Sequence, residues 1–121
     1  MSKARVIEIT AQDLYSVRAA IQGGANRVEL CTALGVAGLT PSIGLMEGAV
    51  EVASESGLKG FVDVLIRPRE GDFIYDKDEV KTAIRDIRRA VAAGVDGVVI
   101  GALRPDGRID RDAMARMMEA A

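Results

Sequence analysis

Charged side chains and the single thiol of this chain interrupt short apolar segments. Glu8 and Glu29 each lie among apolar residues, Cys31 comes two residues after Glu29, and Arg67 directly follows another apolar run. Two carboxylates and a guanidinium can together hold a polar ligand or move a proton. A thiolate is a soft ligand that suits the cuprous ion, Cu+. The sequence therefore offers two kinds of chemistry, provided that its folding brings these groups together.

The elements that would position these groups alternate between strands and helices. Four β-branched runs are too short for helices and are predicted to be strands, at residues 5–9, 28–31, 61–66 and 97–100. Apolar residues recur at helical spacing between and after them, which predicts helices over 14–21, 45–56, 80–91 and 112–118. This order predicts an α/β fold with parallel strands joined by right-handed crossovers. Four such units would form half of a TIM-type barrel, which has eight.

Alternation along the predicted strands decides which side chains share a face. It places Glu8, Glu29 and Arg67 on the face away from the helices, where Gly101 leaves room beside them. We expect these three side chains to converge on one concave surface. There they can clamp a polar ligand, or neutralise one another as a buried network. Arg69 is predicted to lie exposed in the following loop, paired with a neighbouring carboxylate.

The sulfur-bearing residues allow both a metal-binding and a packing interpretation. Cys31 is the candidate copper ligand, but one thiol makes a poor site, and a small buried apolar role fits it equally well. Met114, Met117 and Met118 have the spacing of the inner stripe of a helix. We expect these methionines to pack against other elements and not to bind metal.

Composition limits the other classes of function. The chain has 121 residues, 49% of them hydrophobic, with 16 basic and 18 acidic residues and a net charge of −2. The interspersed charges predict no nucleic-acid partner and no anionic membrane surface, and no apolar run approaches the length of a membrane span. The start Met-Ser-Lys-Ala-Arg also lacks a secretory apolar core, so we expect a cytoplasmic protein. One cysteine forms no internal disulfide, which suits a reducing compartment. The complete absence of histidine removes the commonest metal ligand and general base.

Four sequence blocks resemble those of the CutC family, which is named for copper homeostasis and has a TIM-type barrel fold. They occur in order and with the family's spacing, as Gly-Gly-Ala-Asn-Arg-Val-Glu-Leu-Cys at 23–31, Gly-Leu-Thr-Pro-Ser at 38–42, Ile-Arg-Pro-Arg at 66–69 and Gly-Asp-Phe at 71–73. The resemblance reaches only the first half of the family's pattern. It implies one half-barrel domain over residues 1–121 that ends before the fifth strand.

The resemblance also suggests which residues form the site. It implies that Glu8, Glu29 and Arg67 occupy charged positions of the family's site, and that Asp72 is the acid of the family's Gly-Asp-Phe loop. The family's histidine and arginine on a fifth strand have no counterpart in this chain. Thr10 stands where the family commonly has a cysteine, so one copper thiolate of the family is missing.

Three interpretations of function remain open from the sequence. The first is a CutC-like role in copper binding and homeostasis. The second is a TIM-barrel enzyme that acts on a small anionic molecule, with Arg67 holding the anion and Glu8 or Glu29 moving a proton. The third is an inactive half-barrel that self-associates. In each case two open sheet edges predict a homo-oligomer, most simply two copies that complete an eight-stranded barrel.

Overall fold

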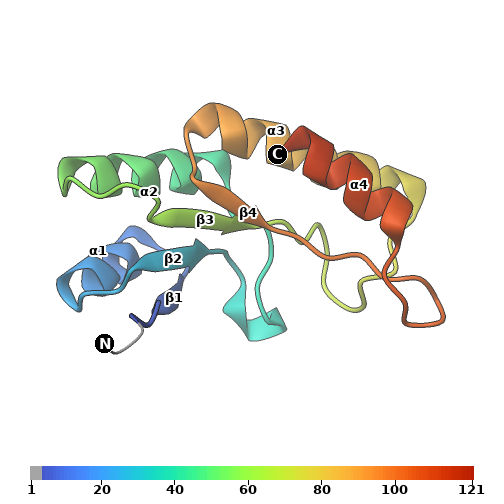
Figure 1. The fold of residues 1–121 in the computed structure, drawn as a ribbon, viewed down its shortest axis with the longest axis horizontal. Helices are drawn as coiled ribbons and strands as arrows, with labels where there is room; N and C mark the ends of the chain where they lie inside the picture. The colour runs from blue at the N-terminus through green and yellow to red at the C-terminus, as the bar shows by residue number, and fades with distance from the viewer. Residues whose placement is uncertain (1–3) are drawn as a thin grey trace.

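Four parallel βα units form the structure, in the order that the sequence predicts (Figure 1). The computed structural model describes residues 4–121. The sheet contains β1 (Glu8–Ala11), β2 (Arg27–Leu30), β3 (Val62–Leu65) and β4 (Gly97–Val99), paired in parallel in that order. The helices are α1 (Leu14–Gln22), α2 (Ile43–Glu55), α3 (Lys77–Ala93) and α4 (Arg111–Ala120), and a 3-10 turn, η1, spans Leu34–Val36. The predicted α/β class and parallel pairing are confirmed.

Polar residues fix where each helix begins. Each of the helices α1–α4 has an N-cap residue whose side chain accepts a hydrogen bond from a backbone N–H of the first turn. These N-cap residues are Asp13, Ser42, Asp76 and Asp110. The helix α3 has the strongest start signal, because Asp76 and Glu79 exchange hydrogen bonds in a capping box. It ends at Gly94, whose φ of 89° belongs to the left-handed region that favours glycine. These local signals set the crossover lengths that allow parallel pairing.

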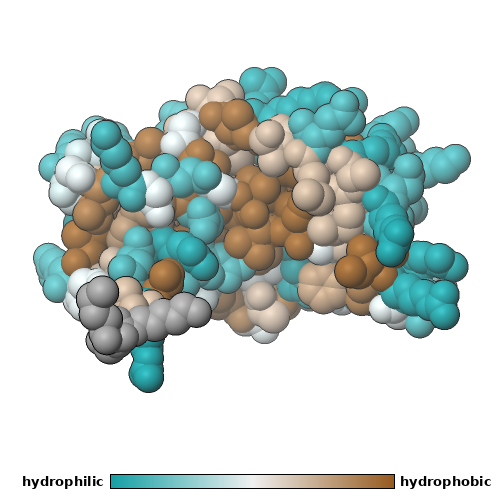
Figure 2. Space-filling model, in the orientation of Figure 1, coloured by the Kyte–Doolittle hydropathy of each residue, from teal (hydrophilic) through white to brown (hydrophobic). Residues whose placement is uncertain are grey.

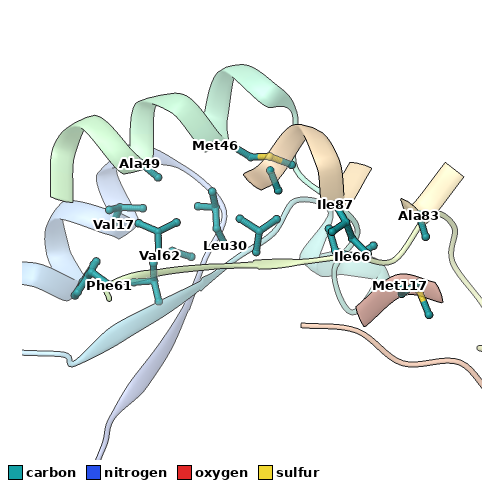
Figure 3. Close-up of a cluster of buried hydrophobic side chains, with 14 of the residues drawn as sticks. Val17, Leu30, Met46, Ala49, Phe61, Val62, Ile66, Ala83, Ile87 and Met117 are labelled. Carbon is teal, nitrogen blue, oxygen red and sulfur yellow. The ribbon is translucent and has the colours of Figure 1, made fainter. Parts of the chain in front are cut away.

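The hydrophobic core lies between one face of the sheet and the helices. Val28, Leu30, Val62 and Val64 alternate with polar neighbours along β2 and β3, and all four are buried toward the helices. Figure 3 shows Leu30 and Val62 among side chains of α1 and α2, with Met117 of α4 at the opposite end of the cluster. The predicted assignment of strand residues to the helix side is confirmed.

The first strand differs from its predicted bounds. It begins at Glu8 instead of Arg5, because the pairing of β1 with β2 starts where Glu8 lies opposite Arg27. Residues 4–7 are exposed. Of the amino-terminal stretch that we expect to lack a secretory leader, residues 1–3 lie outside the described residues. No helix within residues 4–121 is long and apolar enough to cross a membrane.

Candidate functional site

A cluster of charged side chains lies on the face of the sheet away from the helices. Nε of Arg27 lies 2.6 Å from Oε2 of Glu8 and 3.6 Å from Oδ2 of Asp63. Glu29 is the register partner of Asp63 on the neighbouring strand. This inner-wall cluster therefore contains three carboxyl groups, from Glu8, Glu29 and Asp63, around the single guanidinium of Arg27.

Partial burial and mutual repulsion change the protonation of two of these carboxyl groups. Burial raises the pKa of Glu29, and the charges of Glu8 and Asp63 raise it further. The pKa of Asp63 is also raised, first by burial, although the charge of Arg27 acts in the opposite direction. Carboxyl groups with a raised pKa are common at sites of proton transfer. The inner-wall cluster is thus a candidate site for proton transfer.

Replacing Glu29 with glutamine is expected to stabilise the fold at pH 7. The folded pKa of Glu29 lies above its ordinary value of 4.5, so the folded state binds the proton more tightly than the unfolded state. Its contribution to stability is present below pH 4.5 and is lost as the pH rises through the folded pKa. Glu29→Gln removes this loss and should therefore raise the free energy of unfolding at pH 7 above that of the wild type.

Urea denaturation at several values between pH 4 and pH 8 measures this effect. The matched control is Glu51→Gln on the exposed face of α2, which should follow the wild-type pH profile. A parallel offset between wild type and Glu29→Gln at every pH would contradict the assignment of a raised pKa to Glu29.

In the described structure, Arg67 is not paired with the inner-wall carboxylates. This side chain is only 7% exposed, and its Nη1 donates to the carbonyl oxygens of Val36 (2.6 Å) and Gly38 (2.8 Å). Its Nη2 donates to the carbonyl oxygen of Gly71 at 2.9 Å, and its Cζ lies 5.5 Å from the centre of the Phe73 ring. Among the described residues, no ion pair includes Arg67. Arg67 therefore holds two loops together and pairs with neither Glu8 nor Glu29 among the described residues, and the convergence of the three side chains on one concave surface stays a prediction.

Asp72 also lies apart from the inner-wall cluster. Its carboxylate is 63% exposed and accepts hydrogen bonds from Nη2 of Arg69 (3.1 Å) and from the backbone N–H of Ile74 (3.0 Å). These two bonds lower the pKa of Asp72, so it is a fixed negative charge that shapes the β3–α3 loop. Arg69 pairs with Asp72 as the sequence predicts, and it pairs with Glu79 and stacks on Tyr75 as well.

Cys31 lies beneath the loop that follows β2. The thiol-bearing residue is 1% exposed. A Cβ atom added to Gly38 would lie 3.6 Å from Sγ of Cys31 and 3.0 Å from Cδ2 of Leu65, so the backbone at Gly38 closes directly over the thiol. The guanidinium of Arg67 holds the carbonyl oxygen of the same glycine. We call residues 33–38 the cover loop, because this loop ends at Gly38, whose backbone lies against the thiol.

The environment of Cys31 does not make a complete copper site. Burial raises the pKa of its thiol, and the charge of Glu29 raises it further. Within residues 4–121, no three His, Cys, Asp or Glu side chains are grouped so that they could hold a metal ion. A cuprous ion bound at Cys31 would therefore need a second donor from elsewhere.

Arg27 and Asp63 were not among the predicted site residues, although alternation assigns both to this face. The signal was the same alternation that selected Glu29, since Arg27 precedes it by two positions and Asp63 lies opposite it in the sheet. The register between strands, which the sequence does not reveal, makes Arg27 the cation that pairs with Glu8.

Together, the four parallel units and the polar inner wall define the class of this protein as an α/β chain with the architecture of half a barrel. The sequence profile of the CutC family matches residues 5–121, and the chain belongs to the CutC family. A solved structure of a CutC protein from Streptococcus agalactiae, provisionally assigned to copper homeostasis, superimposes with a TM-score of 0.88 at 35% identity. The match covers 97% of this chain and 55% of that chain.

Curated relatives agree in family and differ in length. A family protein CutC of Vibrio atlanticus is 47% identical over 108 residues, which make up 89% of this chain and 42% of the relative. A family protein CutC of Agrobacterium fabrum is 48% identical over 105 residues, 87% of this chain and 39% of the relative. This chain thus spans less than half the length of these relatives, so its four units correspond to about half of a CutC barrel.

Proposed function

We propose that this chain takes part in copper homeostasis by offering Cys31 as a thiolate donor to a cuprous ion. Membership of the CutC family carries the proposal, together with the provisional role of the S. agalactiae relative. Thiolates are preferred ligands of Cu+, and Cys31 is the only cysteine of the chain. The ion is the cargo in this proposal, and a second soft donor comes from another molecule.

The surroundings of Cys31 give this donor two properties. The raised pKa of the Cys31 thiol means that Cu+ has to displace a proton. Below the thiol pKa, the affinity for Cu+ should therefore increase by up to about tenfold for each unit by which the pH rises. Cys31 is buried and the cover loop lies against its thiol, so we expect the ion to reach Sγ only when that loop moves aside. We therefore expect weak and slow binding.

Replacing Cys31 with serine is expected to weaken Cu+ binding at least tenfold, because the only thiolate is lost. Reduced protein is titrated with Cu+ against a competing chelator, at pH 6 and pH 8. Met46→Leu is the matched control, since it removes a buried thioether sulfur without touching the thiol. Equal affinities of wild type and Cys31→Ser would remove Cys31 from the copper proposal.

A second candidate function is enzymatic proton transfer by Glu29. Its support is the raised pKa of Glu29 beside Asp63, on the polar face of the sheet. Three carboxyl groups around one guanidinium make this wall a poor site for an anion. Arg67, the residue expected to hold the anion, already uses both of its terminal nitrogens to bind carbonyl oxygens. We therefore propose a neutral or cationic small molecule as the ligand of the inner-wall cluster, in place of the anionic one.

An NMR screen of small cationic and neutral compounds tests this second candidate. A true ligand should shift the resonances of Glu29 and Asp63, and its affinity should fall at least tenfold in Glu29→Gln. Circular dichroism checks that Glu29→Gln keeps the wild-type fold, so that a loss of affinity is assigned to the missing carboxylate. Compounds that bind wild type and Glu29→Gln equally would rule out a role for Glu29.

A further inference from the structure

The outer side of β1 borders an apolar groove that the sheet leaves open. This β1–α1 groove has a volume of about 380 Å³ and is lined mainly by Ile7, Ile9, Tyr15 and Ala19. Ile7 is 55% exposed although alternation directs it to the same side as buried Ala11. The corresponding positions of β2 and β3 are buried, because α1 lies against β2 and α2 lies against β3, each helix belonging to the preceding unit. The groove is thus the position where a preceding βα unit would pack.

The other end of the series presents the complementary surface. The helix α4 packs on α3, with Ala113 and Met117 buried, while Met118 is 64% exposed. Strand β4 has β3 as its partner in the sheet, and its three residues are only half-buried. Figure 2 shows apolar surface gathered over the middle of the molecule, at the place of β4 in Figure 1. An apolar helix face and an apolar strand edge therefore lie together at this end.

The interior of the chain repeats one packing step. Each strand pairs with the next in parallel, and each helix packs on the next, from α1 through α4. A second copy can continue this series at both ends. Its β1 would then lie beside β4, and its α4 would lie in the β1–α1 groove. Eight parallel strands close a TIM-type barrel, and four units supply half of that number.

We infer that a second copy of this chain occupies the β1–α1 groove, with the Met118 face of its α4 in the groove and its β4 beside β1. A two-fold axis makes the same contact twice and leaves no open strand edge. The closure also completes the site, because the charged wall of one copy then faces that of the other. Glu8, Glu29 and Asp63 of both copies would line one enclosed interior.

Sedimentation equilibrium of the 121-residue chain tests this assembly. At about 10 µM the wild type should have about twice the monomer mass of 12.8 kDa. Tyr15→Asp alters the groove, and Met118→Lys alters the helix face. Each should raise the dissociation constant at least about 100-fold, since each places a charge in both apolar contacts. Both residues are largely exposed in the single chain, and circular dichroism checks that each variant folds.

Mixing the two variants separates this contact from other modes of dimerisation. A mixed pair has one native contact, and one in which the new aspartate meets the new lysine, so the mixture should dimerise at least tenfold more tightly than either variant alone. Leu58→Asp, in the turn after α2 and outside both surfaces, is the control and should dimerise like wild type. A wild-type monomer at about 100 µM, variants as dimeric as wild type, or no recovery on mixing would each overturn the inference.

Discussion

Replacing Arg67 with alanine is expected to lower the free energy of unfolding by about 3 kcal/mol, the largest effect that we expect from a single side chain. The substitution removes three hydrogen bonds to the carbonyl oxygens of Val36, Gly38 and Gly71, together with the stacking on Phe73. These carbonyl groups would lose a buried, charged donor, and each orphaned acceptor costs free energy. Urea denaturation measures the change.

The same substitution should expose the thiol. Arg67 holds Gly38, and Gly38 lies directly over Cys31, so release of the cover loop should open a path to Sγ. We expect the reaction of Cys31 with a thiol reagent to be at least about tenfold faster in Arg67→Ala under conditions where the protein remains folded, because local opening would need less free energy. This readout distinguishes a loop clamp from a residue that merely fills space.

Two further variants control the experiment. Arg89→Ala removes an arginine from the exposed side of α3 and should change stability by no more than about 0.5 kcal/mol. Arg67→Lys keeps the charge without the planar fork that reaches several carbonyl groups, so it should fall between wild type and Arg67→Ala. A thiol reaction rate that is unchanged in folded Arg67→Ala would show that other contacts hold the cover loop.

Alternation and helical spacing predicted the fold well because they act locally. Val28 and Leu30 favoured burial of one face of β2, and the spacing of apolar residues predicted a helix over 80–91, within α3. The exposure of Ile7 could not be predicted in this way. Its side of the strand followed from alternation, but β1 is an edge strand of the described sheet, so this side has no neighbouring strand and helix to bury it.

The site was harder to predict than the fold, and Arg67 shows why. Its partners are backbone carbonyl groups, which every residue carries and which give no signal in the sequence. The cover loop was equally hidden, because Ala33 and Ala37 adopt positive φ values of 53° and 71° that alanine seldom takes. A glycine or asparagine there would have suggested the turn.

Glu29 and Asp63 could be assigned to the inner wall because period-two alternation needs no tertiary information. What alternation leaves open is which acid faces which base. The register that pairs Glu8 with Arg27, and Glu29 with Asp63, is a property of the assembled sheet. The chemistry of the inner-wall cluster therefore depends on register as much as on residue type.

Replacing Gly97 with alanine is expected to destabilise the fold by about 1–3 kcal/mol through the inner-wall cluster. A Cβ atom at this position of β4 would lie 2.6 Å from Oδ1 and 3.3 Å from Cγ of Asp63. The Asp63 side chain is short and lies between Arg27 and its register partner Glu29, so it can yield only by leaving this arrangement. The absence of a side chain at Gly97 is thus what allows Asp63 to face the inner wall.

Gly101→Ala is the matched control, because an added Cβ atom there would meet nothing within 4 Å. It should leave stability unchanged or raise it by up to about 1 kcal/mol, since alanine restricts the unfolded chain. The double variant Gly97→Ala with Asp63→Ala should recover most of the loss, because it removes the carboxylate that the methyl group meets. Additive effects of Gly97→Ala and Asp63→Ala would mean that the two positions do not interact, and that the packing of Asp63 against Gly97 does not set the geometry of the cluster.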